Sequence, residues 1–264
     1  DTDRADYSAA PGAVTVNLAD GSASNDGFGT TDTLSGIEQV TGSAFNDTIT
    51  GDALANRLDG GAGNDLLDGG ESPPGVLRET DTVNYSVEGG ADAVTVNLAT
   101  GVATDTFGDS DTLLNIERVI GTDFADALTG GDVTNRNTNA ENFEGRAGDD
   151  VITGGGIAAG FGTFALYNSA PSGIVVNLSI SPIDLDPGDG TDLIAAGTAR
   201  DGYGTVDTLV EINNIRGSAF ADLIYGSDST TGSEYFEGTA GADTIHGGGG
   251  IDYLRYENSP GAVT

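Results

Sequence analysis

The sequence contains no cysteine, methionine, tryptophan or lysine. The absence of cysteine excludes disulfides and thiolate metal sites. Its nine basic residues are all arginine and face 42 acidic residues, which gives a formal net charge of −33. Nucleic acid is therefore not an expected partner, because phosphate binding requires clustered lysine and arginine. No apolar run approaches the ~18 residues of a membrane span.

Part of the negative charge must be neutralised if the chain is to fold. Only 37% of the residues are hydrophobic and 6% are aromatic, and low hydrophobicity with high net charge is typical of disorder. The strict spacing described below indicates order instead. A hard divalent cation would reconcile the two, because carboxylate and carbonyl oxygens suit calcium. A metal can also stabilise an extracellular fold in place of disulfides.

The chain repeats itself with a period of about 80 residues. Tyrosine recurs at Tyr7, Tyr85, Tyr167 and Tyr256, and the first three are each followed by a passage that ends in VTVNL or VVNL. We interpret these passages as ordinary coils of one continuous solenoid. The predicted repeats span residues 1–80, 81–162 and 163–251, and a fourth begins at 252–264. Both ends therefore look like cuts through a longer array.

A nine-residue period lies within the longer one. GGAGNDLLD begins at Gly60, GRAGDDVIT at Gly145, GTAGADTIH at Gly238 and GGGGIDYLR at Gly247. These segments follow the pattern GGxGxDxUx, in which U is a large aliphatic residue. Looser copies begin at Gly42, Gly121 and Gly217.

With this motif the chain resembles the RTX, or haemolysin-type, calcium-binding repeat family over nearly its whole length. The resemblance implies an all-β fold, a parallel β-roll or β-helix solenoid of stacked coils with calcium-binding turns. It also implies export as an unfolded chain by type I secretion, with a C-terminal signal that this segment does not show.

Nine residues supply a turn and a strand. Glycine at positions 1, 2 and 4 permits positive φ, the aspartate at position 6 adds a side-chain oxygen, and the last three residues form a strand whose middle residue faces the core. Two such units make a coil of ~18 residues, and coils stack ~4.8 Å apart. Asp47 and Asp65 are 18 residues apart and should therefore lie one above the other. Two stacked turns offer the six to eight oxygens that calcium prefers.

The predicted calcium ligands are aspartates at equivalent places in these turns. Those at position 6 of a nonapeptide are Asp47, Asp65, Asp126, Asp150, Asp222, Asp243 and Asp252. Asp3 and Asp81 align with Asp252, while Asp32, Asp111 and Asp207 follow a looser turn. The glycines expected to shape the sites are Gly60, Gly61, Gly63, Gly145, Gly148, Gly238, Gly241, Gly247, Gly248 and Gly250. The pattern is broken by Thr163, where a site should be lost, and by Asn56, a weaker ligand.

The residues outside these turns do not predict an enzyme. His246 is the only histidine and occupies an outward-facing ninth position, and there is no cysteine nucleophile or GxSxG motif. The repeated tyrosines are expected to pack against a coil, and the scattered arginines to pair with surface charge. Asn17, Asn97 and Asn177 fit either an internal asparagine ladder or a turn.

The sequence leaves three alternative functions open. The first is a secreted structural or adhesive array at the bacterial cell surface, such as a surface layer, fibre or adhesin stalk, which could assemble with copies of itself end to end or laterally. The second is a non-catalytic RTX module of a type I-secreted enzyme or toxin. The third is a β-helix enzyme acting on polysaccharide. The expected cofactor is Ca²⁺ in each of the first two.

Overall fold

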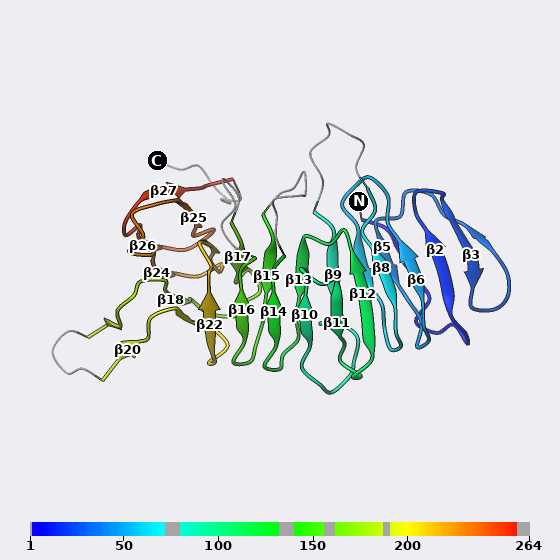
Figure 1. The fold of residues 1–264 in the computed structure, drawn as a ribbon, viewed down its shortest axis with the longest axis horizontal. Helices are drawn as coiled ribbons and strands as arrows, with labels where there is room; N and C mark the ends of the chain where they lie inside the picture. The colour runs from blue at the N-terminus through cyan, green and yellow to red at the C-terminus, as the bar shows by residue number, and fades with distance from the viewer. Residues whose placement is uncertain (1, 72–79, 132–139, 156–161, 187–190, 258–264) are drawn as a thin grey trace. The chain divides into compact units, whose positions relative to one another are not determined.

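Every regular element of the protein is a β-strand in the computed structural model, which describes residues 2–71, 80–131, 140–155, 162–186 and 191–257 (Figure 1). Because the described chain has no helix, none there could cross a membrane. The chain forms two compact units that divide between Thr122 and Asp123. The all-β prediction is confirmed, whereas most of the predicted fourth repeat, from residue 258 on, lies outside the described residues.

The first unit is built mostly from three-residue strands, because each nonapeptide leaves three residues after its six-residue turn. Its strands are β1 (Arg4–Asp6), β2 (Val14–Asn17), β3 (Ser22–Asp26), β4 (Asp32–Thr33), β5 (Gln39–Thr41), β6 (Thr48–Thr50), β7 (Arg57–Asp59), β8 (Leu66–Asp68), β9 (Thr82–Asn84), β10 (Thr95–Asn97), β11 (Val102–Thr104), β12 (Ser110–Leu114) and β13 (Arg118–Ile120).

Two sheets run through this first unit. One has the order β1-β5-β7-β9-β13 and is parallel throughout. The other has the order β10-β11-β12-β8-β6-β2-β3-β4, with parallel pairing from β12 through β8 and β6 to β2. The chain alternates between the sheets, so β5, β6, β7 and β8 form successive half-coils. This is the parallel β-roll that the nonapeptide predicts.

The second unit repeats the arrangement. Its strands are β14 (Ala127–Thr129), β15 (Asn142–Glu144), β16 (Val151–Thr153), β17 (Phe164–Leu166), β18 (Val175–Asn177), β19 (Ile183–Asp184), β20 (Leu193–Ile194), β21 (Thr198–Arg200), β22 (Val206–Val210), β23 (Asn214–Arg216), β24 (Leu223–Tyr225), β25 (Ser233–Glu237), β26 (Thr244–His246) and β27 (Ile251–Leu254). One sheet has the order β15-β17-β23-β25-β27, and the other β26-β24-β18-β21-β22-β16-β14. The short strands β19 and β20 pair separately.

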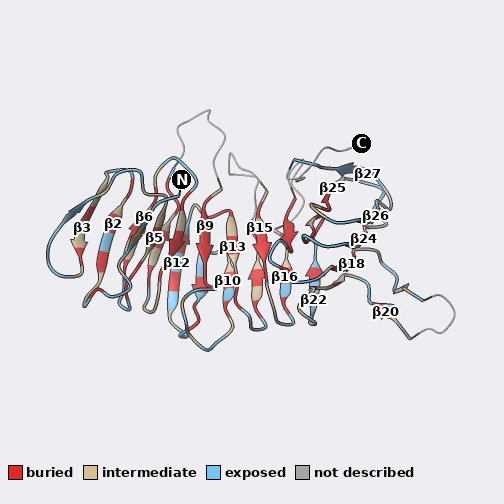
Figure 2. Ribbon diagram, turned by 180° about the vertical axis from the view of Figure 1, so that it is seen from behind, coloured by how far each residue is buried: buried red, intermediate tan, exposed pale blue. Residues whose placement is uncertain are grey.

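The core consists of the middle residues of the strands, stacked in register. Val40, Leu58, Val83 and Val119 form one column in the first unit, and all four are fully buried. Figure 2 shows the same concentration of buried residues on the strands. Leu254 was also expected to face the core but is 47% exposed, because β27 has a described neighbour on one side only.

The VTVNL passages differ from the prediction that they form ordinary coils. Each opens a three-stranded antiparallel meander within the second sheet: β2-β3-β4, β10-β11-β12 and β18-β21-β22. The chain therefore crosses the same sheet three times before it returns to the other sheet. In the turns, the Oδ1 of Asn17 accepts the Asp20 N–H at 3.0 Å, and that of Asn97 accepts the Thr100 N–H at 3.1 Å. These two asparagines are thus turn residues.

Candidate metal sites

One edge of each unit carries a vertical row of aspartates, each directly before a strand of the meander-containing sheet or at the second residue of such a strand. Strand register aligns Asp47 with Asp65 and Asp65 with Asp111 in the first unit. In the second unit the register aligns Asp126 with Asp150, Asp150 with Asp207, and Asp222 with Asp243. We call this set the aspartate ladder: Asp47, Asp65, Asp111, Asp126, Asp150, Asp207, Asp222 and Asp243.

Backbone hydrogen bonds connect the rungs of the aspartate ladder. The Asp47 N–H donates to Oδ1 of Asp65 at 2.7 Å, and the Asp65 N–H donates to Oδ1 of Asp111 at 3.0 Å. The corresponding distances in the second unit are 2.8 Å from Asp126 to Asp150, 3.2 Å from Asp150 to Asp207, and 3.1 Å from Asp222 to Asp243. Each carboxylate is therefore held in place by the neighbouring coil.

Glycine is required where the turns approach one another. Gly61 and Gly63 have φ of 93° and 116°, and a Cβ at Gly63 would lie 2.7 Å from the carbonyl carbon and 2.9 Å from the carbonyl oxygen of Phe45 in the adjacent turn. Gly60 has no positive φ, but a Cβ there would overlap Oδ2 of Asp65. A Cβ at the first glycine of the other full turns, Gly145, Gly238 and Gly247, would likewise overlap Oδ2 of the aspartate in the same turn. Positive φ occurs at Gly148, Gly241, Gly248 and Gly250.

The middle rungs of the aspartate ladder are buried with one carboxylate oxygen unpartnered. Asp65 and Asp150 are 2% and 1% exposed, and the Oδ2 atom of each has no hydrogen-bond partner. Burial, together with the like charge of neighbouring aspartates, raises the pKa of each carboxyl to about 8. Burial also raises the pKa of Asp111 and of Asp207 to about 7. Such groups require either a proton or a cation.

The donors fit a hard cation. An unpartnered carboxylate oxygen lies beside glycine turns that bring backbone carbonyls close, and the set contains only oxygen, as calcium prefers. Among the described residues no three acidic or histidine side chains form a ready-made metal group. A cation here would therefore be held by paired aspartates together with carbonyl oxygens.

The opposite edge carries a second row, which we call the mixed ladder. Register aligns Asp3, Glu38, Asn56, Asp81 and Glu117 in the first unit. The Asn56 N–H donates to Oδ1 of Asp81 at 2.9 Å, and the Asp81 N–H donates to Oε2 of Glu117 at 3.1 Å. Asn56 thus occupies an aspartate position, as the sequence predicts.

The mixed ladder of the second unit consists of Glu141, Thr163, Asn213, Glu234 and Asp252. Thr163 stands at the register position of Asp252 and brings no carboxylate there, and the loss of a metal site at this position stays a prediction. Sequence reasoning missed the four glutamates, because no GGxGx turn precedes them. They could have been found, since each lies two residues before a core residue of the next strand: Glu38, Glu117, Glu141 and Glu234.

Asp32 joins neither ladder. It lies exposed in β4, which pairs only with β3 among the described strands. Its partner is a tyrosine: the Tyr7 hydroxyl donates to Oδ2 of Asp32 at 3.2 Å. The hydroxyls of Tyr85 and Tyr167 donate in the same way to Asp111 and Asp207, at 3.2 and 3.0 Å. Tyr85 and Tyr167 therefore pack as expected and also orient an acid, whereas Tyr256 is 51% exposed and does not pack as predicted.

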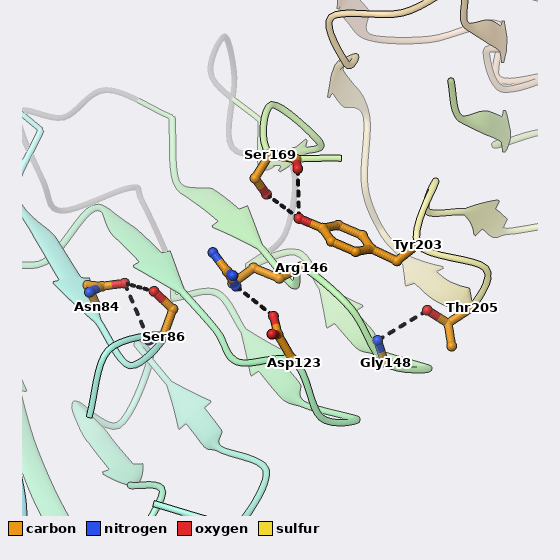
Figure 3. Close-up of polar contacts among 8 residues, drawn as sticks. All are labelled: Asn84, Ser86, Asp123, Arg146, Gly148, Ser169, Tyr203 and Thr205. Atoms are coloured by element: carbon orange, nitrogen blue, oxygen red, sulfur yellow. Dashed lines mark hydrogen bonds and ion pairs between the residues drawn. The ribbon is translucent and has the colours of Figure 1, made fainter. Parts of the chain in front are cut away.

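The other polar residues agree with structural roles. Arg57 pairs with Asp59 at 3.3 Å, and Arg146 pairs with Asp123 at 3.0 Å (Figure 3). His246 stacks on Tyr225 with ring centroids 4.4 Å apart.

Comparison with known families gives one match, to the RTX calcium-binding nonapeptide repeat, in four copies at residues 41–72, 137–156, 211–230 and 228–258. A comparison with curated proteins finds no match. The matched segments include five rungs of the aspartate ladder: Asp47, Asp65, Asp150, Asp222 and Asp243. Repeats of this kind are typical of secreted proteins and are typically non-catalytic. The four matched segments of this chain are RTX calcium-binding nonapeptide repeats.

Proposed function

We propose that this chain is a secreted structural or adhesive protein that folds when calcium occupies its aspartate ladder. The observation that carries the proposal is the pair of buried, unpartnered Oδ2 atoms of Asp65 and Asp150 in stacked glycine turns. A bound cation would satisfy these oxygens and offset part of the −33 charge. The ligands that we assign are the predicted aspartates of both ladders. Asp32 lies in neither ladder and is the predicted ligand that the geometry supports least.

Calcium would act as a folding switch, because it binds the stacked turns and not the unfolded chain. A site whose Kd lies 100-fold below the ambient calcium concentration adds about 2.7 kcal/mol of stability. Several such sites would stabilise the chain outside the cell and leave it unfolded in a calcium-poor cytosol. That behaviour suits export as an unfolded chain, followed by folding at an extracellular or cell-surface location.

A structural role is favoured over catalysis by the composition of the repeats. The prominent acids are accounted for by turn stacking, and the buried tyrosines by contacts to those acids. Repeated coils with acidic edges can also associate with further copies of the chain when calcium bridges them. A non-catalytic module attached to a secreted enzyme or toxin would use the same calcium chemistry.

Calcium titration followed by far-ultraviolet circular dichroism and sedimentation velocity tests the proposal. We expect a coil spectrum in chelator, a strand spectrum at sub-millimolar calcium, and calcium-dependent association of folded chains. Asp65→Asn with Asp150→Asn should require more calcium, whereas the exposed pair Asp20→Asn with Asp92→Asn should not. A strand spectrum that is indifferent to chelator would refute calcium-dependent folding, and folded chains that stay monomeric would refute self-assembly.

A further inference from the structure

The loop before the last strand of each meander has the same layout in the three repeats: residues 26–32, 105–111 and 201–207. It begins and ends with aspartate. In the first and third repeats, the opening aspartates Asp26 and Asp201 accept backbone N–H groups through Oδ1. Their Oδ2 atoms accept the hydroxyls of Thr30 and Thr205. Both carboxylate oxygens are therefore satisfied within the loop.

The second repeat breaks this arrangement. Asp109 stands where the others have threonine, and a carboxylate has no proton to donate to Asp105. Asp109 does accept the Gly63 N–H at 3.1 Å, as Thr205 accepts the Gly148 N–H at 3.1 Å (Figure 3). Asp105 is 0% exposed, and its Oδ2 has no hydrogen-bond partner. The substitution thus adds a charge and removes a donor at once.

A second acid is added at the same place. Glu88 stands where the first and third repeats have Ala10 and Ala170. Its Oε2 accepts the hydroxyl of Thr106 at 3.0 Å, and Thr106 itself replaces a glycine of the other two repeats. The Oε1 atom of Glu88 is buried and has no partner. The second repeat therefore has two unpartnered buried oxygens that the others lack.

The surroundings of Glu88 are acidic and open to solvent on one side. Burial, together with the charges of Asp111 and Asp105, raises the pKa of its carboxyl to about 9. Glu88 also lines a pocket of about 210 Å³ with Ser43, Gly61, Val87 and Phe107. Glu88 therefore borders this pocket on one side.

We propose that the second repeat holds an additional calcium ion between Oε1 of Glu88 and Oδ2 of Asp105, outside the nonapeptide turns. Calcium accepts six to eight oxygens, so two carboxylates can be completed by backbone carbonyls and water. The ion would satisfy both unpartnered oxygens and offset the charge brought by Asp109. Glu88 and Asp105 lie outside the aspartate ladder, so this inference does not rest on the proposed function.

The test replaces the residues that are particular to the second repeat with those of its neighbours. Glu88→Ala with Asp109→Thr should restore a hydroxyl donor to Asp105 and remove one carboxylate ligand. Calcium bound per chain is counted by native mass spectrometry and by equilibrium dialysis at saturating calcium. We expect the variant to bind one ion fewer and to keep its strand spectrum.

The control is Glu71→Ala with Asp20→Thr, two exposed positions with the same change in charge, which should leave the ion count unchanged. If the double variant does not fold, Glu88→Gln keeps the side-chain volume and removes one ligand charge, and calcium affinity is compared instead. An unchanged count and affinity would overturn the proposal and leave Glu88 as a protonated acid. One ion in the natural chain and none in the variant would support this site while contradicting calcium binding by the aspartate ladder.

Discussion

At the residue scale, glycine serves two separate needs within one turn. Position 1 must leave room for the aspartate carboxylate of its own turn, while positions 2 and 4 must adopt positive φ beside the carbonyls of the adjacent turn. Position 2 tolerates exceptions: Arg146 and Thr239 occupy it with φ of 78° and 70°. Position 4 has no such exception in the full copies at Gly63, Gly148, Gly241 and Gly250.

Gly63→Ala should therefore cost more than its backbone conformation alone. Positive φ costs an alanine about 1–2 kcal/mol, and the new methyl group would also push the turn away from Phe45. Gly89→Ala is the matched control, because Gly89 has φ of 79° with nothing within 4 Å of its Cβ position. Urea denaturation in saturating calcium measures both variants. Equal losses of stability would mean that the turns are not tightly stacked.

At the scale of strands, the nonapeptide pattern in the sequence predicted the structure of each nine-residue unit. Its turn, its three-residue strand and the alignment of Asp47 with Asp65 follow directly from a constant period. The meanders were missed because alternation in VTVNL is the same in parallel and antiparallel strands. The hairpin signal lay in the residues that follow: Gly21, Gly101 and Gly197 have φ of 65–68° at the turn. Three strands in one sheet then bring Asp111 and Asp207 onto the aspartate ladder, which sequence separation alone could not reveal.

The tyrosine–aspartate contact joins the two sheets, because the tyrosine follows a strand of one sheet and the aspartate belongs to the other. Tyr167→Phe should destabilise the calcium-loaded protein by about 1.5–3 kcal/mol, the usual cost of removing a hydrogen bond to a charged group. Tyr7→Phe removes the same contact at an exposed aspartate and should cost less than about 1 kcal/mol. Thermal unfolding of both variants compares them. A larger loss for Tyr7→Phe would contradict this account.

At the scale of the whole molecule, the net charge and the buried acids act in the same direction. Asp65, Asp111, Asp150 and Asp207 have folded-state pKa values of about 7 to 8, well above the ordinary value of 3.8. Without a cation, the folded state binds more protons than the unfolded state when the pH lies between 3.8 and about 8. Its stability is therefore greatest below the ordinary pKa and is lost as the pH rises through 7 to 8.

In chelator, the protein should thus keep more strand structure at pH 5.5 than at pH 8, where the coil spectrum is expected. Saturating calcium should reduce or reverse this trend, because calcium binds the deprotonated carboxylates that are otherwise destabilising. Circular dichroism across the pH series measures both arms, with Asp65→Asn and Asp150→Asn together as the variant whose pH dependence should flatten. The exposed pair Asp20→Asn with Asp92→Asn should keep the full dependence. Greater stability at pH 8 in chelator would show that these acids are not held in the buried, unneutralised state from which calcium-dependent folding follows.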